Sequence, residues 1–176
     1  MKIGLVTGEY PPMQGGVGAF TQELAKALAA QGHELHIITS RLARPPQERL
    51  PASNFWELVA RADAWREPIP LGYAQLHPRG RRWRWADVSL VADIAQRYDL
   101  DVVNIQYQPA AYNMRSAAVN LLPWRLKGLA KSVVTFHDLR PPFLFPKAGR
   151  LREGVVRLMA RQADGVIVTN QADGER

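Results

Sequence analysis

The chain has 176 residues, 47% of them apolar and 22% charged, values that fit one globular domain and exclude a disordered or collagen-like chain. It has no cysteine, which excludes disulfides, a thiolate nucleophile and cysteine-ligated zinc or iron–sulfur sites. Its net charge of +7 and pI near 10.1 favour anionic partners, namely nucleotide phosphates, nucleic acid or an acidic lipid surface.

The start of the chain does not have the pattern of a targeting signal. Glu9 comes before the apolar core of a signal peptide could form. No apolar run approaches the roughly 18 residues of a membrane-spanning helix. We therefore expect a cytoplasmic protein.

The first forty residues predict a strand, a helix and a second strand. The apolar run 2–6 predicts the first strand, and 8–18, rich in glycine and proline, is expected to be irregular. A helix is expected over 20–32, and the run 35–40 predicts the second strand. The apolar residues at helical spacing are Phe20, Leu24, Ala27 and Leu28.

The rest of the chain continues this alternation. Residues 41–70 carry five prolines and are interpreted as an elaborated crossover, within which Asn54 and Glu57 are placed to cap a short helix. Strands are predicted at 71–76, 101–105, 132–136 and 166–168, and helices at 88–95, at 116–122 closed by Pro123, and at 151–159.

This pattern predicts an α/β fold, an open parallel sheet with helices on both faces. Right-handed crossovers bring the carboxyl ends of parallel strands to one edge, where ligands bind in such sheets. The segments expected at that edge are all polar or glycine-rich: 8–18, 39–40, 106–108, 137–138 and 169–170.

The glycines at 15, 16 and 18 lie between a predicted strand and a predicted helix. Such a loop suits an anion, because backbone N–H groups and the helix dipole favour negative charge. A tight turn that needs positive φ and holds no ligand is the alternative. The loop has no P-loop lysine, and no acid follows the second strand to bind a ribose, which disfavours an NTPase and an NAD-dependent oxidoreductase.

Five motifs occur in order along the chain: Met1-Lys2-Ile3-Gly4-Leu5-Val6 with Tyr10-Pro11-Pro12, Gly15-Gly16-Val17-Gly18, Asp101-Val102-Val103-Asn104-Ile105-Gln106, Val133-Val134-Thr135-Phe136-His137-Asp138, and Ala163-Asp164-Gly165-Val166-Ile167-Val168-Thr169-Asn170. Together they resemble the N-terminal domain of retaining family-4 glycosyltransferases, which have the two-domain GT-B architecture. The likeness covers most of the chain outside about residues 41–100.

The resemblance implies that residues 1–176 form one Rossmann-like domain on the acceptor side of a cleft. This domain stops before its last unit, and the donor-binding domain is absent. The implied enzyme transfers a sugar, of hexosyl type, from a nucleotide-diphosphate sugar to a glycan, lipid or small-molecule acceptor with retention. No cofactor or metal is implied.

The resemblance also implies roles for particular residues. Gly15 and Gly16 approach the donor diphosphate, and His137, directly after a strand, contacts the transferring sugar. No protein nucleophile is implied, because the leaving diphosphate assists the attack of the acceptor. Acceptor contacts fall on polar residues of the same edge: Tyr10, Gln14, Gln106, Tyr107, Asp138 and Asn170.

Two further loops support an alternative. Arg79–Trp85 interleaves arginines with tryptophans, which is typical of a solvated loop or of contact with an anionic membrane, and less so of nucleic acid. The apolar loop 141–146 is interpreted as an acceptor wall, a lipid contact or a part of the core. The alternative function is a non-catalytic module that binds an anionic membrane or polyanion through its arginines.

Three other histidines are given no role in the site. His33 and His36 lie in or beside a predicted strand and are interpreted as packing residues. His77 is placed in a loop without a partner.

Overall fold

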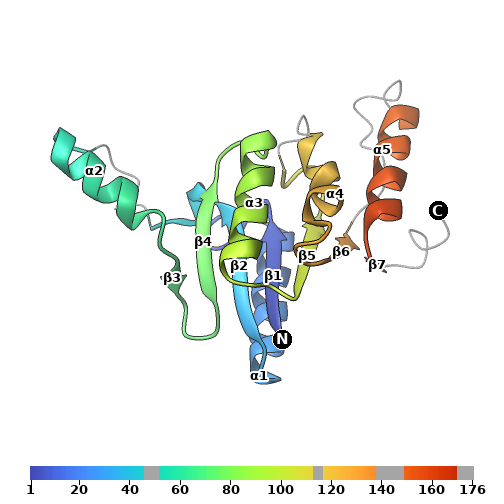
Figure 1. Cartoon of the computed structure of the whole chain (residues 1–176), viewed down its shortest axis with the longest axis horizontal. Coiled ribbons are helices and arrows are strands. Elements are labelled where there is room, and N and C mark those ends of the chain that lie inside the picture. Colours follow the sequence, from blue (N-terminus) through green and yellow to red (C-terminus); the bar gives the residue numbers. More distant parts are fainter. Residues whose placement is uncertain (46–51, 113–116, 138–148, 170–176) are drawn as a thin grey trace.

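The fold centres on a sheet with these strands: β1 Lys2–Thr7, β2 Glu34–Ser40, β3 Ile69–Pro70, β4 Gln75–Gly80, β5 Val102–Tyr107, β6 Lys131–Phe136 and β7 Gly165–Val168. The structure is a computed structural model and describes residues 1–45, 52–112, 117–137 and 149–169. The strand order is β3-β4-β2-β1-β5-β6-β7 (Figure 1). Neighbours pair in parallel, except that the short edge strand β3 is antiparallel to β4.

Helices cover both faces of this sheet. They are α1 Gly16–Ala30, α2 Phe55–Ala64, α3 Trp85–Arg97, α4 Leu122–Leu126 and α5 Gly149–Gln162, with 3-10 turns at Arg41–Ala43 and Ala118–Leu121. Helix α1 packs behind β1 and β2, while α3, α4 and α5 lie on the opposite face (Figure 1). This arrangement confirms the predicted α/β fold with a mostly parallel sheet. None of the helices in the described ranges is long and apolar enough to cross a membrane.

The sheet separates two apolar cores. Successive side chains of a strand point to opposite faces, so Leu5 of β1 joins the core under α1 and Val6 joins the core under α3. Val103 and Ile105 of β5 also face α3. Asn104, which lies between them, and Gln106, which follows Ile105, therefore point to the face of α1.

Helix α1 begins earlier than predicted, and two residues of its predicted apolar stripe, Leu24 and Leu28, pack against the core. It starts at Gly16 rather than Phe20, so the expectation of irregular structure is wrong for the last glycines of the loop. Its buried positions include Val17, Thr21 and Ala25, while Phe20 is 44% exposed. The apolar spacing predicted the helix correctly, but Phe20 contacts the ring of His137 at the ligand edge.

The strand predicted at 71–76 is wrong in its bounds. Residues 71–74 form a turn, in which the Leu71 N–H donates to the Ala74 carbonyl at 2.9 Å and Gly72 has a φ of 81°. The strand runs instead through Gln75–Gly80. A left-handed glycine ends any continuous strand here, and His77 and Arg79 become strand residues.

The helix predicted at 116–122 is also wrong. The chain forms a 3-10 turn at Ala118–Leu121, and α4 then begins, with Pro123 in its first turn. Proline lacks only an N–H that has no partner in a first turn, so it opens a helix as readily as it closes one.

Helix α2 has the predicted cap, and its aromatic residues do not pack against the sheet. The Asn54 side chain accepts from the Glu57 N–H at 2.9 Å, and the Glu57 carboxylate accepts from the Ser53 N–H at 2.7 Å. Yet Phe55 and Trp56 are exposed, in edge-to-face contact with each other, and the helix projects away from the sheet (Figure 1).

Candidate functional site

The carboxyl edge of the sheet carries a polar cluster on the face of α1. Thr7 ends β1 and is in register with Gln106 of β5, and His137 follows β6. The His137 N–H donates to the Tyr107 carbonyl at 3.1 Å, which continues the ladder by one residue. Strand alternation points the side chains of Thr7, Gln106 and His137 to the same face.

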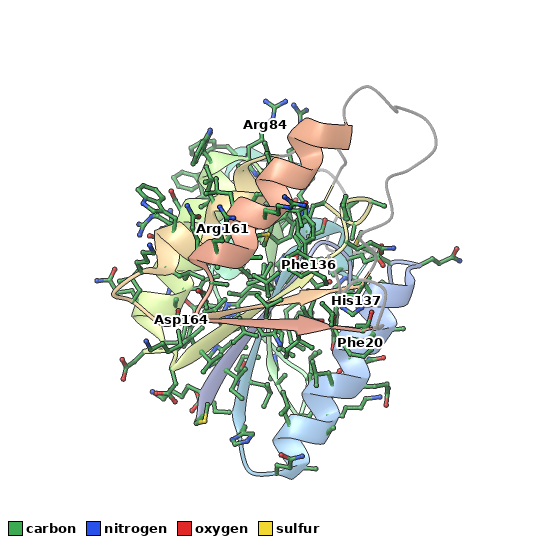
Figure 2. All side chains as sticks on the ribbon, turned by 90° about the vertical axis from the view of Figure 1, so that its right-hand side faces the viewer. Phe20, Arg84, Phe136, His137, Arg161 and Asp164 are labelled. Carbon is green, nitrogen blue, oxygen red and sulfur yellow. The ribbon has the colours of Figure 1, made fainter. Side chains whose placement is uncertain are left out.

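His137 is held from two sides. Its ring meets the ring of Phe20 on α1 edge to face, with 4.8 Å between centroids (Figure 2). Its Nε2 lies 2.8 Å from Oε1 of Gln106. Because that oxygen accepts, His137 donates from Nε2, and Nδ1 has no hydrogen-bond partner in the described part of the chain. Burial lowers the pKa of His137, so the ring is neutral at pH 7.

Gln106 is fully buried, and its Nε2 has no hydrogen-bond partner among the residues that the structure describes. The hydroxyl of Thr39, at the end of β2, is in the same condition. Leaving a buried donor unpaired costs about 1–3 kcal/mol. Polar groups of this kind at the ligand edge are typical of a site whose partner is not part of the protein.

The glycine loop does not need its glycines for positive φ. Gly15 precedes α1 with a φ of 169°, which is ordinary extended backbone, and Gly16 and Gly18 lie within the helix. All the glycines with positive φ in the described ranges are elsewhere. The tight-turn alternative is therefore wrong for this loop.

Packing against backbone explains only Gly18, since a Cβ on Gly15 would meet the end of one flexible side chain. A Cβ on Gly18 would lie 3.0 Å from the Glu9 carbonyl oxygen and 3.1 Å from the Tyr10 Cα. A Cβ on Gly15 would lie 1.9 Å from Oε1 of Glu9. A Cβ on Gly16 would meet nothing within 4 Å. Gly16 is exposed, and neither its conformation nor its contacts require glycine.

Two of the predicted acceptor residues are core residues instead. Tyr10 is 1% exposed and its hydroxyl lies 2.7 Å from that of Tyr73, so it holds the loop against the α1 side of the sheet. Tyr107 is buried on the opposite face, where its ring packs against Phe136 at 5.5 Å. Their position after a strand predicted acceptor contacts, but both aromatic rings fill the core. Gln14 is exposed beside the loop.

The remaining predicted residues have no described position. Asp138, Asn170 and the apolar loop 141–146 lie outside the described residues. Their roles stay predictions.

The arginine-rich loop is more ordered than expected. The backbone N–H groups of Arg81, Arg82 and Arg84 donate to the Asp87 carboxylate at 2.9–3.2 Å, and the three side chains are exposed. Trp83 is buried, so its prediction as an interfacial residue is wrong. Only the arginines and Trp85, which is 60% exposed, face solvent here.

Sequence reasoning missed a buried histidine pair on the other face. Nε2 of His77 lies 3.0 Å from Nδ1 of His36, whose Nε2 lies 3.0 Å from the Glu34 carboxylate. Burial, then the nearby positive charges of His36, Arg79 and Arg97, lower the pKa of His77 to about 3. Correct bounds for β4 would have revealed the pair, because side chains alternate along paired β2 and β4 and place His36 and His77 on the same face.

Comparisons with known proteins show which family the chain resembles. The family model of Glycosyltransferase Family 4 matches residues 14–176 of this chain. N-acetyl-alpha-D-glucosaminyl L-malate synthase of Bacillus anthracis is 32% identical over 107 residues, which are 61% of this chain and 24% of that protein. The chain thus spans about a quarter of the length of this curated relative.

Proposed function

The chain belongs to glycosyltransferase family 4, and from this premise we propose that it forms the acceptor side of the active site of a retaining GT-B glycosyltransferase. The donor is a nucleotide-diphosphate sugar, of hexosyl type. In this proposal a second domain, outside these residues, holds most of the donor nucleotide. The acceptor is a glycan, a lipid or a small molecule. The name of the Bacillus anthracis relative gives one small-molecule example, L-malate.

The observation that carries the proposal is Gly16. It opens α1 in a position where neither φ nor packing requires glycine, and the space that its Cβ would take is open. Backbone N–H groups at such an end bind phosphate, helped by the helix dipole. Gly15 and Gly16 together are proposed to approach the donor diphosphate.

His137 and Gln106 are proposed to serve the transferring sugar. A neutral His137 donates to Gln106 and keeps Nδ1 as an acceptor for a sugar hydroxyl. The Gln106 amide has an unused donor for a sugar or acceptor oxygen. Gln14, Asp138 and Asn170 remain candidates for acceptor contacts.

The proposed reaction needs no protein nucleophile. The acceptor oxygen forms a bond to the anomeric carbon as the bond from that carbon to the diphosphate oxygen breaks on the same face. The acceptor proton passes to the departing diphosphate. The residues of this chain supply orientation and electrostatic stabilisation, which dominate in such transfers.

A transfer assay tests this proposal. The polypeptide that joins this chain to a donor domain is expected to turn over a nucleotide sugar, and the 176-residue chain alone is expected to be inactive, because the nucleoside contacts lie in the other domain. Turnover by the isolated chain would contradict the division of roles. Absence of turnover with any nucleotide sugar in the longer polypeptide would contradict the function.

A second candidate function is binding to an anionic membrane or polyanion. It is favoured by the exposed side chains of Arg81, Arg82 and Arg84, which project from a loop whose backbone is fixed by Asp87. This candidate is compatible with the first, because a protein that binds an anionic surface through these arginines can still bind its substrates at the carboxyl edge of the sheet.

A further inference from the structure

Glu9 places a carboxylate at the amino end of α1. Its Oε1 accepts from the Gly18 N–H at 3.4 Å. The same carboxylate fills the space that the side chain of residue 15 would take, since a Cβ there would lie within 1.9–2.3 Å of its three end atoms. Gly15 therefore leaves a small space beside the helix end, and an anion of the protein itself occupies it.

The helix supplies no other anion at this position. The first turn of α1 contains no acidic residue, and Gly15 has no side chain with which to cap it. A negative charge at a helix amino end is stabilised by about 0.3–1 kcal/mol at an exposed site. Glu9 takes this stabilisation through one long hydrogen bond, at the upper limit of useful geometry.

The backbone of Glu9 is held more firmly than its carboxylate. The Thr7 hydroxyl donates to the Glu9 carbonyl at 2.8 Å and ties the loop to β1. The side chain can therefore leave the helix end while the loop keeps its place.

A second observation shows that this edge offers more donors than Glu9 uses. Gln106, in register with Thr7 on the neighbouring strand, is completely buried and its Nε2 has no partner in the described ranges. Its amide meets His137, which contacts Phe20 in the first turns of α1 (Figure 2). The unused donor therefore lies in the polar cluster of His137 and Phe20, on the face of the sheet that α1 covers.

We propose that Glu9 is an internal competitor of the donor diphosphate, which must displace the Glu9 carboxylate from the amino end of α1 in order to bind. This inference rests on the proposed function, because it takes the glycine loop as the diphosphate site. It adds a residue that sets how tightly the anion binds: the carboxylate holds the site in the free protein and weakens binding of the phosphate.

Variants show whether the Glu9 carboxylate competes with a bound phosphate or only stabilises the fold. Glu9→Gln keeps the length of the side chain but removes its charge, so pyrophosphate affinity should rise about three- to tenfold, from the lost helix-end stabilisation and the lost repulsion. Glu23→Gln is the matched control, since it removes the same charge from an exposed position farther along α1. Gly15→Ala should weaken binding, because its methyl group fills the space that both anions need.

The test is a titration of the 176-residue chain with inorganic pyrophosphate, followed by the NMR signals of the amides at 15–18. Residue-resolved signals distinguish this site from arginine-bound pyrophosphate elsewhere on a chain of net charge +7. Thermal midpoints are measured for the same variants. Tighter binding at 15–18 in Glu9→Gln, but not in Glu23→Gln, is the expected result.

Each other result overturns the inference in a distinguishable way. Equal tightening in both variants would show a general effect of charge. Unchanged affinity in Glu9→Gln, with amides that still respond, would remove Glu9 as a competitor and leave the proposed site intact. A lower midpoint with unchanged affinity would make Glu9 a structural cap. Amides that never respond would refute the proposed diphosphate site itself.

Discussion

Two histidine clusters lie on opposite faces of one sheet and differ in where their unpaired polar atoms lie. On the face of α1, His137 sits half-buried at the end of a strand, with one nitrogen on Gln106 and the other without a partner in the described part of the chain. On the face of α3, His36 and His77 lie within strands, both almost fully buried, and bond to each other.

The difference teaches that position along a strand decides what a histidine can do. A residue after the carboxyl end of a parallel strand faces the ligand edge, whereas one in the middle faces a helix. The pair of His36 and His77 extends to the Glu34 carboxylate and is used for packing. That pair leaves Nδ1 of His77 without a partner among the described residues, but this atom is buried under α3, whereas the unused atoms of the His137 cluster lie at the ligand edge.

The largest expected effect is on the proposed sugar transfer, measured in a polypeptide that joins this chain to a donor domain. His137→Ala should lower kcat/KM about 10²- to 10³-fold, the loss expected for one preorganised hydrogen-bonding group. His77→Gln is the matched control and should keep wild-type kcat/KM, because it lies on the other face. Equal losses in both variants would remove the distinction between the clusters.

The arginine loop extends the comparison to a third polar region. Replacing Arg81, Arg82 and Arg84 by serine should weaken binding to anionic vesicles by roughly 3 kcal/mol, at about 1 kcal/mol for each cation near the surface. Vesicle co-sedimentation at two salt concentrations measures this, and neutral vesicles are the control. Binding that persists in the triple variant would refute a role for this loop.

The glycine loop allows the next test, on stability. Gly18→Ala should lower the free energy of unfolding by about 2 kcal/mol, because its Cβ meets the backbone of Glu9 and Tyr10 at 3.0–3.2 Å. Gly16→Ala, with open space around its Cβ, should change it by less than about 0.5 kcal/mol. Chemical denaturation measures both, and similar losses would contradict the separation of structural from open glycines.

The buried pair predicts a smaller effect that depends on pH. His77 has a pKa of about 3 when folded, whereas an unfolded histidine has about 6.5. Between these two pKa values the unfolded state binds a proton that the folded state does not bind. The free energy of unfolding therefore falls as the pH drops from above 6.5 toward 3. From pH 7 to 5.5 the loss should be about 1 kcal/mol. His77→Gln should remove it, while His33→Gln should not.

The fold was largely predictable because its signals are local. Apolar runs gave β1, β2, β5, β6 and β7, and helical spacing gave α1, α3 and α5. The predicted bounds of β4 and α4 were wrong because Gly72 and Pro123 are each compatible with two local structures. Gly72 allows either a strand interruption or a turn, and Pro123 either ends or opens a helix, so tertiary packing decides.

The candidate site was predictable only in part. Gly16 and His137 follow from the rule that parallel strands end at one edge. That Tyr10 and Tyr107 are core residues depends on which neighbours lie above them, which no spacing in the sequence specifies. The place of the Glu9 carboxylate likewise depends on a gap left by Gly15 in three dimensions.

The most direct test of the central claim is kcat/KM for Gly16→Val, measured beside its thermal midpoint in a polypeptide that joins this chain to the proposed donor domain. Nothing lies within 4 Å of the new Cβ, so the midpoint should change little. The branched side chain should block approach of the diphosphate to the helix end and lower kcat/KM about 100-fold or more. Wild-type kcat/KM in a folded Gly16→Val would contradict the account, because an open glycine without structural need would then have no part in binding.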